Sequence, residues 1–129
     1  MKTILLVDNC KSERSELMKV LVGYGYAVCE AETLNQAVDK FKQEQPNLTI
    51  ICLNPFGVGW EHISEGLPVA RTIIEHDSSA KIIMTSYNGT HSNIVEAIKC
   101  GIKDLVMLPF YPQRLIEAVE KQVGSEYKH

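Results

Sequence analysis

The sequence predicts an α/β fold in which a doubly wound parallel sheet carries helices on both faces. Two observations support this class: short aliphatic runs alternate five times with helical segments along the 129 residues, and the run over 48–53 is apolar almost throughout. The alternation is the pattern of repeated β-α units, and such an apolar run is typical of a strand covered on both faces. We expect a single domain over 1–124 and a C-terminal tail over 125–129.

Capping residues, glycines and a proline mark where the expected helices begin and end. Thr33 and Gln36 have the spacing of a capping box, Gly23 and Gly101 are expected helix stops, and Pro112 opens the last helix. The expected strands cover 3–7, 26–31, 48–53, 81–86 and 104–108. The expected helices cover about 12–22, the segment between Thr33 and Pro46, about 67–76 with Pro68 in the first turn, about 92–100, and the segment after Pro112.

The bulk composition argues against several classes of function. The net charge is −3, so no basic stripe is available to neutralise the phosphates of nucleic acid or of an anionic membrane. No apolar run approaches the roughly 20 residues that span a bilayer, and the N-terminus lacks the pattern of a signal peptide, so a cytoplasmic protein is expected. The four cysteines form no C-x-x-C pair, which predicts reduced thiols rather than a disulfide framework or a structural metal site.

Four expected strand ends define the edge of the sheet at which a functional site would lie. In doubly wound parallel sheets, ligands and reactive groups lie beyond the carboxyl ends of the strands, near the switch point. The strand ends that matter are therefore Asp8-Asn9, Cys52, Thr85-Ser86 and Leu108-Pro109.

Motifs at these strand ends resemble the receiver domain of bacterial response regulators, which has the chemotaxis-regulator-like, flavodoxin-like fold. The resemblance covers almost the whole chain, and the order and spacing of the motifs make it specific. It implies a five-stranded sheet in the order 2-1-3-4-5. The motifs are LLVDN at 5–9, QPNLTIICLNP at 45–55, IIMTSY at 82–87 and EAIKCGIKDLVMLPF at 96–110.

The resemblance implies a defined phosphoryl-transfer chemistry. In that family, two acids after the first strand and an Asp at the end of the third strand hold a magnesium ion, and that Asp accepts a phosphoryl group from a histidine kinase. A Thr or Ser after the fourth strand and a Lys after the fifth contact the phosphoryl oxygens. Magnesium prefers several hard oxygen ligands, and the ion and the Lys offset the charge of the transferred group.

Carried over by position, the family's pocket is only partly kept. Asp8 is at the position of the first acid, and the neutral Asn9 is at the second. The phosphoacceptor position, six residues after Pro46, is Cys52. The hydroxyl position is Thr85, which is intact.

The two positions on the fifth strand also depart from the family. Leu108 is at the lysine position, just before the retained Pro109, and Leu105 is at the aromatic switch position. The resemblance therefore implies a degenerate receiver with weak or lost binding of Mg²⁺, no other cofactor and no enzymatic turnover. Such a domain would act through contact with a protein partner, either a histidine kinase or another signalling protein. A homodimer through the face formed by the fourth helix, fifth strand and fifth helix is a further option.

The segment over 54–65 is longer than the family usually has there. Phe56, Trp60 and His62 make it a candidate interaction loop. Trp60 could equally fold back over the altered pocket and fill it, and the composition favours neither reading.

Two alternatives to the degenerate receiver are retained. One is an unconventional receiver that is still phosphorylated. The other is a cysteine-based redox switch, in which Cys52 pairs with Cys10 or is itself oxidised. Since no cationic side chain is evident beside Cys52 to lower the pKa of its thiol, we expect Cys52 to behave as a small, half-buried apolar residue.

Overall fold

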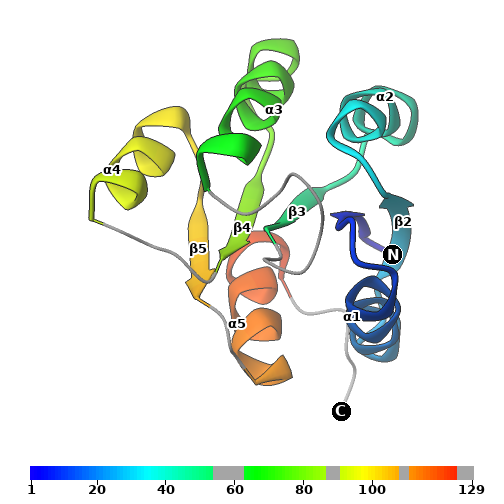
Figure 1. Ribbon diagram of the computed structural model, residues 1–129. Coiled ribbons are helices and arrows are strands. Elements are labelled where there is room, and N and C mark those ends of the chain that lie inside the picture. The colour runs from blue at the N-terminus through cyan, green and yellow to red at the C-terminus, as the bar shows by residue number, and fades with distance from the viewer. Residues whose placement is uncertain (54–62, 87–90, 108–110, 125–129) are drawn as a thin grey trace.

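The computed structural model describes residues 1–53, 63–86, 91–107 and 111–124, which form one parallel sheet with helices on both faces (Figure 1). The strand order is β2-β1-β3-β4-β5, which confirms the predicted fold class. The strands are β1 (Thr3–Val7), β2 (Ala27–Ala31), β3 (Leu48–Leu53), β4 (Ile82–Ser86) and β5 (Asp104–Met107). The helices are α1 (Lys11–Gly23), α2 (Leu34–Glu44), α3 (Ile63–His76), α4 (His91–Cys100) and α5 (Pro112–Val123).

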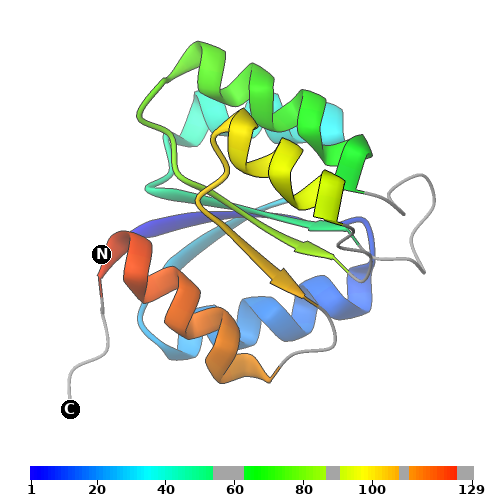
Figure 2. The same cartoon turned by 90° about the vertical axis from the view of Figure 1, so that its left-hand side faces the viewer.

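Two helical layers enclose the sheet. Helices α2, α3 and α4 cover one face, and α1 and α5 cover the other (Figure 2). Successive side chains of a strand point to opposite faces, so the sheet supplies two separate cores. In β1, Leu5 and Val7 pack on the side of α2 and α3, whereas Ile4 and Leu6 pack on the side of α1 and α5.

The neighbouring strands β1 and β3 place residues of the candidate site side by side. β1 and β3 pair in parallel with Val7 opposite Ile51, and every residue from Ile4 to Val7 is fully buried. Asp8 continues the alternation of β1 and therefore falls on the side of α1. Cys52 belongs to the core on that same side, so the ends of β1 and β3 face α1 together.

Helix α3 begins earlier than expected. It starts at Ile63 instead of 67, so Pro68 lies inside the helix and not in its first turn. A proline inside a helix lacks the N–H that would donate to the carbonyl four residues back, and the Pro68 side chain is exposed. The buried residues Gly66 and Leu67 precede it, which shows that the apolar face of the helix extends upstream of the proline. The expected irregular segment is therefore shorter than predicted, and its remainder over 54–62 lies outside the described residues.

The glycine that follows α1 is not the one predicted. Gly23 is the last helical residue, and the left-handed backbone conformation is found two residues later, at Gly25, with a φ of 95°. The stop predicted after α4 is confirmed, since Gly101 has a φ of 103°. The other expected elements begin and end within one residue of the observed ones.

No helix among the described residues is long and apolar enough to cross a bilayer.

A glycine pair tests the role of backbone conformation. At Gly101 an added Cβ would lie 2.9 Å from Ile74 Cδ1, on a backbone with positive φ. Gly101→Ala should therefore lower the free energy of unfolding by about 1–2 kcal/mol. At Gly23 nothing lies within 4 Å of an added Cβ. Gly23→Ala should raise the stability by at most about 0.5–1 kcal/mol, because alanine is the better helix former. Urea unfolding of both variants measures the difference, and equal effects would contradict this account.

Candidate functional site at the carboxyl edge of the sheet

The carboxylate of Asp8 is buried just beyond the end of β1. Its backbone N–H donates to Ala31 O at 3.1 Å, which extends the pairing with β2 by one residue. The side chain is fully buried. Oδ1 accepts a hydrogen bond from the Cys10 N–H at 2.9 Å, whereas Oδ2 has no hydrogen-bond partner among the described residues. Oδ1 thus stabilises the turn into α1, whereas Oδ2 remains without a hydrogen-bond donor among the described residues.

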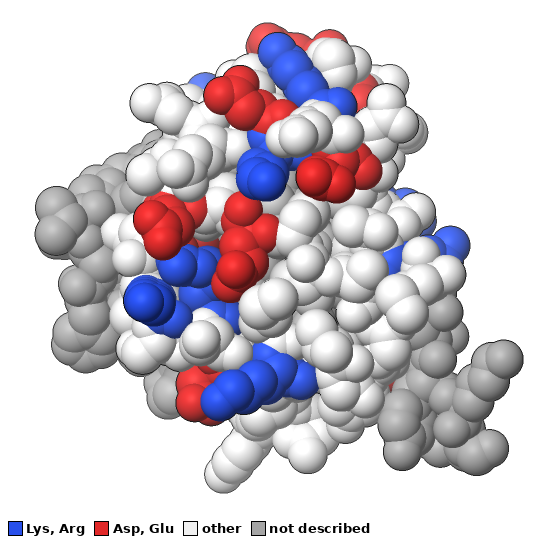
Figure 3. All heavy atoms as spheres, turned by 90° about the vertical axis from the view of Figure 1, so that its right-hand side faces the viewer, with Lys and Arg blue, Asp and Glu red and all other residues white. Residues whose placement is uncertain are grey.

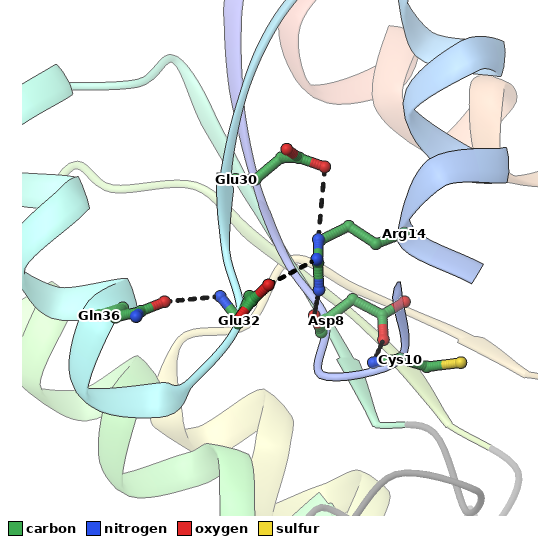
Figure 4. Close-up of polar contacts among 6 residues, drawn as sticks. All are labelled: Asp8, Cys10, Arg14, Glu30, Glu32 and Gln36. Carbon is green, nitrogen blue, oxygen red and sulfur yellow. Dashed lines mark hydrogen bonds and ion pairs between the residues drawn. The ribbon is translucent and has the colours of Figure 1, made fainter. Parts of the chain in front are cut away.

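A buried guanidinium lies on the other side of this turn. Arg14 Nη1 donates to the backbone O of Asp8 at 2.6 Å, and Nη2 donates to Glu32 Oε1 at 2.9 Å (Figure 4). Nε is 3.3 Å from Glu30 Oε1. The Arg14 side chain is only 7% exposed, while those of Glu30 and Glu32 are 40% and 65% exposed. We call these four residues the Arg14 network.

The network continues into α2 through the capping box. Thr33 Oγ1 accepts from the Gln36 N–H at 3.1 Å, as the spacing predicted. Gln36 Oε1 accepts from the N–H of Glu32 at 2.9 Å, so it reaches one residue further back than in the usual capping box. The backbone of Glu32 is thereby held by α2 while its carboxylate holds Arg14 of α1.

Cys52 lies at the end of β3, in register with Thr85 of β4. It is fully buried, so the expectation of a half-buried residue is wrong: the strand is covered by α1 and α5 right up to this position. Burial raises the pKa of the thiol well above its ordinary value, the charge of Asp8 raises it further, and the Thr85 hydroxyl opposes the rise. The side chain is a neutral thiol at physiological pH.

The structure adds a residue to the pocket that the sequence did not point to. Ligand atoms of Asp8, Glu13 and Cys52 all lie within 4.8 Å of one another, and we call these three residues the thiol–carboxylate cluster. Glu13 is in the first turn of α1, where an acid is favoured by the helix dipole. That position explained Glu13 without a site, which is why sequence reasoning passed over it. The signal available was its side-chain direction, since a helical side chain points back toward the N-terminus.

Both carboxyl groups of the cluster are harder to ionise than usual. Burial raises the pKa of Asp8 to about 6, against the hydrogen bond from Cys10 and the positive charge of Arg14. Burial also raises the pKa of Glu13 to about 7, and the neighbouring charge of Asp8 adds to the rise. The guanidinium opposes this rise only in part, because it donates hydrogen bonds to the backbone carbonyl of Asp8 and to Glu32 and forms an ion pair with Glu30.

The other predicted site residues have mixed placements. Asn9 is partly buried next to Asp8, and Leu105 is partly buried against the core under α3 and α4. Leu108, Phe56, Trp60 and His62 lie outside the described residues. The structure thus brings Asp8, Cys52 and Thr85 together and adds Glu13.

No disulfide links the cysteines. Cys10, Cys29, Cys52 and Cys100 are all outside any disulfide bond. Cys10 Sγ lies 3.4 Å from Ser12 Oγ, at the start of α1.

The surface around the Arg14 network carries both signs of charge. Figure 3 shows the face formed by α1, β2 and α2, where acidic and basic side chains alternate. No large field of one sign is present on the described part of this face. The face therefore offers nothing resembling a phosphate-binding stripe.

Comparison with known proteins decides the family. A family model described as the response regulator receiver domain matches residues 4–120. The chain belongs to this family. The chemotaxis protein CheY of Bacillus subtilis (strain 168) is 34% identical over 122 residues, covering 94% of this chain and 97% of the relative. The chemotaxis protein CheY of Thermotoga maritima is 32% identical over 121 residues, covering 93% and 96%.

Solved structures support the same fold. The receiver domain protein (CheY-like) from Methanospirillum hungatei JF-1 superposes with a TM-score of 0.84 at 23% identity, over 95% of this chain and 94% of that one. The chain is thus a receiver domain of the two-component signalling type, and its matched segment contains the whole thiol–carboxylate cluster. The roles carried over to Asp8, Asn9, Cys52, Thr85, Leu105 and Leu108 stay predictions.

An arginine pair tests the Arg14 network. Arg14→Met keeps the apolar stem but leaves the buried carbonyl of Asp8 without its donor, which should cost about 1–3 kcal/mol of stability. The control is Arg71→Met. Arg71 pairs with Glu96 at 3.3 Å with both side chains about half exposed, so its loss should cost less than about 0.5 kcal/mol. Urea unfolding of the two variants is the measurement, and an equally small effect at Arg14 would show that the network does not stabilise the fold.

The raised carboxyl pKa values predict a dependence of stability on pH. Folding takes the pKa of Asp8 from 3.8 to about 6 and that of Glu13 from 4.5 to about 7, so the folded state binds more protons than the unfolded state in that range. The free energy of unfolding should therefore fall as the pH rises from about 4 to about 7. Asp8→Asn should remove about 1–3 kcal/mol of this fall, because the amide oxygen still accepts from Cys10.

The comparison uses chelator-treated protein and thermal unfolding at several pH values. Asp39→Asn, which alters an exposed carboxylate of α2, is the control and should retain the slope of the wild type. If the pH dependence of stability in Asp8→Asn equals that of the wild type, burial does not raise the pKa of Asp8.

Proposed function

We propose that this receiver domain signals through protein–protein contact and is not switched by phosphorylation of the pocket at the carboxyl edge of the sheet. The observation that carries the proposal is Cys52. It is fully buried near the end of β3, opposite Thr85, at the position to which the family's phosphoacceptor is carried over. Its neutral thiol, with a pKa well above the ordinary value, is a poor nucleophile toward a phosphoryl group, because the thiolate is the reactive form.

The donor set of the pocket also disfavours the family's metal ion. Magnesium binds a near-octahedral set of oxygen ligands and gives up its water reluctantly. The thiol–carboxylate cluster offers two carboxylates and one sulfur, and sulfur is the wrong donor for so hard an ion. We therefore expect Mg²⁺ to bind weakly or not at all. Since Leu108 stands at the lysine position, the charge of a phosphoryl group would have little to offset it.

The face formed by α4, β5 and α5 is the candidate partner surface. Large apolar side chains are exposed there: Ile98 is 64% exposed, Met107 39% and Tyr111 84%. The same elements carry charged groups, such as Arg114 of α5, whose Nη2 lies 3.6 Å from Asp104 Oδ1 of β5. Apolar and aromatic groups with a polar rim are the usual composition of a protein interface. We propose a histidine kinase or another cytoplasmic signalling protein as the partner, and a second copy of this chain as the alternative occupant.

The redox alternative gains no support from the placement of the thiols. Cys52 is fully buried, and the Cys10 thiol lies against Ser12. A thiol that is buried and neutral reacts slowly with oxidants. A role in turnover is also not proposed, because receiver domains are in general signalling modules and not enzymes.

The test is phosphorylation with a small phosphodonor in the presence of Mg²⁺, followed at once by intact mass measurement. The wild type should gain no phosphoryl group. A triple variant, Asn9→Asp, Cys52→Asp and Leu108→Lys, restores the residue types that the family uses and should gain one. The variant thus serves as a positive control in the same scaffold.

Two outcomes would overturn the proposal. One phosphoryl group on the wild type would show a receiver that is still phosphorylated. If the group is kept in Cys52→Ser but lost in Asp8→Asn or Glu13→Gln, the acceptor is a carboxylate of the cluster. If mild oxidant instead converts Cys52 to a disulfide or sulfenic acid in the folded protein, the redox alternative replaces the proposal.

A further inference from the structure

Three different elements bring metal-ligating groups to one point of the structure. Asp8 comes from the turn after β1, Glu13 from the first turn of α1 and Cys52 from the end of β3. The ligand atoms of all three lie within 4.8 Å of one another. This is not a lone cysteine or a patch of surface acids, because two of the three residues are fully buried.

A second observation favours the binding of a cation at this point. Asp8 is fully buried, yet its Oδ2 has no hydrogen-bond partner among the described residues. Leaving a buried charged oxygen unpaired is costly. The nearby cation does not provide the missing partner, because Arg14 donates to the Asp8 carbonyl and to Glu32.

We propose that the thiol–carboxylate cluster binds a thiophilic divalent cation, with Zn²⁺ as the representative ion. A thiolate is a soft ligand and a carboxylate is a hard one. A site that combines them suits a borderline ion such as Zn²⁺ and not the hard Mg²⁺. Three protein ligands leave the fourth tetrahedral position for water or another small donor. The inference rests on the cluster alone and does not depend on how the receiver signals.

The distances allow such a site with a small adjustment. Zinc lies about 2.3 Å from sulfur and about 2.0–2.2 Å from carboxylate oxygen, so tetrahedral ligand atoms are about 3.3–3.6 Å apart. The observed separations are at most 4.8 Å, and a rotation of the long Glu13 side chain can shorten those that involve it. Glu13 is also the partly exposed member of the cluster, so it is the ligand in contact with solvent.

The burial of Cys52 does not oppose binding. A coordinating thiol is deprotonated by the ion itself. Binding would form a bond between the metal and Sγ, break the S–H bond and release that proton to solvent. The ion would also lie between two carboxylates that otherwise repel each other, and it would join β1, β3 and α1 at the edge of the sheet.

The remaining thiols supply matched controls. Cys29 Sγ lies 3.7 Å from Ile4 O, and Cys100 Sγ lies 3.9 Å from Leu67 O. Neither belongs to a metal-ligating group of three among the described residues. Cys10 is the closest sequence neighbour of Asp8 with a thiol, and it tests whether the correct cysteine has been assigned.

The experiment titrates the reduced, metal-free protein with Zn²⁺ alone, in competition with a chromogenic chelator, and repeats the titration with Mg²⁺. One Zn²⁺ should bind per chain with a Kd in the micromolar range or below, at least about a hundredfold more tightly than Mg²⁺. Co²⁺ in place of Zn²⁺ should give the absorption of a thiolate-to-cobalt charge transfer, which identifies sulfur as a ligand.

Variants then assign the ligands. Glu13→Gln and Cys52→Ser should each weaken Zn²⁺ binding at least about tenfold, and Cys52→Ser should remove the charge-transfer band. Three control variants should bind Zn²⁺ as the wild type does: Cys10→Ser, Cys29→Ser and Glu16→Gln. Glu16 is an exposed acid of the same helix as Glu13. Circular dichroism confirms that each variant is folded, and Glu13→Gln, at a partly exposed position, keeps the test decisive if Cys52→Ser unfolds.

Binding only at millimolar Zn²⁺, equal affinity for Mg²⁺, or full binding by both Glu13→Gln and Cys52→Ser would overturn the inference. Weakened binding in Cys10→Ser with unchanged binding in Cys52→Ser would do the same. The phosphodonor experiment reads a different quantity, so a phosphorylated wild type that still binds Zn²⁺ removes the proposed function and leaves this site standing.

Discussion

The buried guanidinium of Arg14 is the interaction on which the carboxyl edge of the sheet depends. A charge removed from water is costly unless it is paired and hydrogen-bonded. Arg14 meets this requirement with a backbone carbonyl and two glutamates that are themselves partly in water. The guanidinium thereby fixes α1 against the ends of β1 and β2, and through the backbone of Glu32 it is tied to the start of α2. A planar fork with several donors can do this, whereas a lysine ammonium could not.

The chemistry of the pocket depends on which groups accept hydrogen bonds from Arg14. Because it holds the carbonyl of Asp8 and not the carboxylate, the carboxylate keeps a buried oxygen without a partner. Because Arg14 fixes the first turn of α1, the preceding residue, Glu13, is held next to that carboxylate. The raised pKa values of Asp8 and Glu13 are therefore consequences of the same packing that stabilises the edge.

The sequence predicted the sheet well because its signals are local. Aliphatic runs, the Thr33 cap and Gly101 each act within a few residues, and the structure confirms them. The start of α3 and the burial of Cys52 depend on how distant segments pack, which explains why those two expectations were wrong. Glu13 was missed for a related reason: a glutamate in a first helical turn has a sufficient local explanation. Its proximity to Cys52 of β3 appears only when the parallel sheet brings strand ends together.

The thiol at position 52, to which we carry over the family's acid, would account for both the proposed loss and the proposed gain at this site. A carboxylate there would complete an oxygen-rich pocket and raise its negative charge, which suits a hard ion and a phosphoryl group. A thiol instead leaves the pocket uncharged at that position until a soft enough cation removes the proton. With Glu13 supplying the second carboxylate, the pocket keeps enough charge to attract a divalent cation while its sulfur selects which cation. The scaffold held by Arg14 would be the same in both cases, so the identity of the ligand can change without any change in the fold.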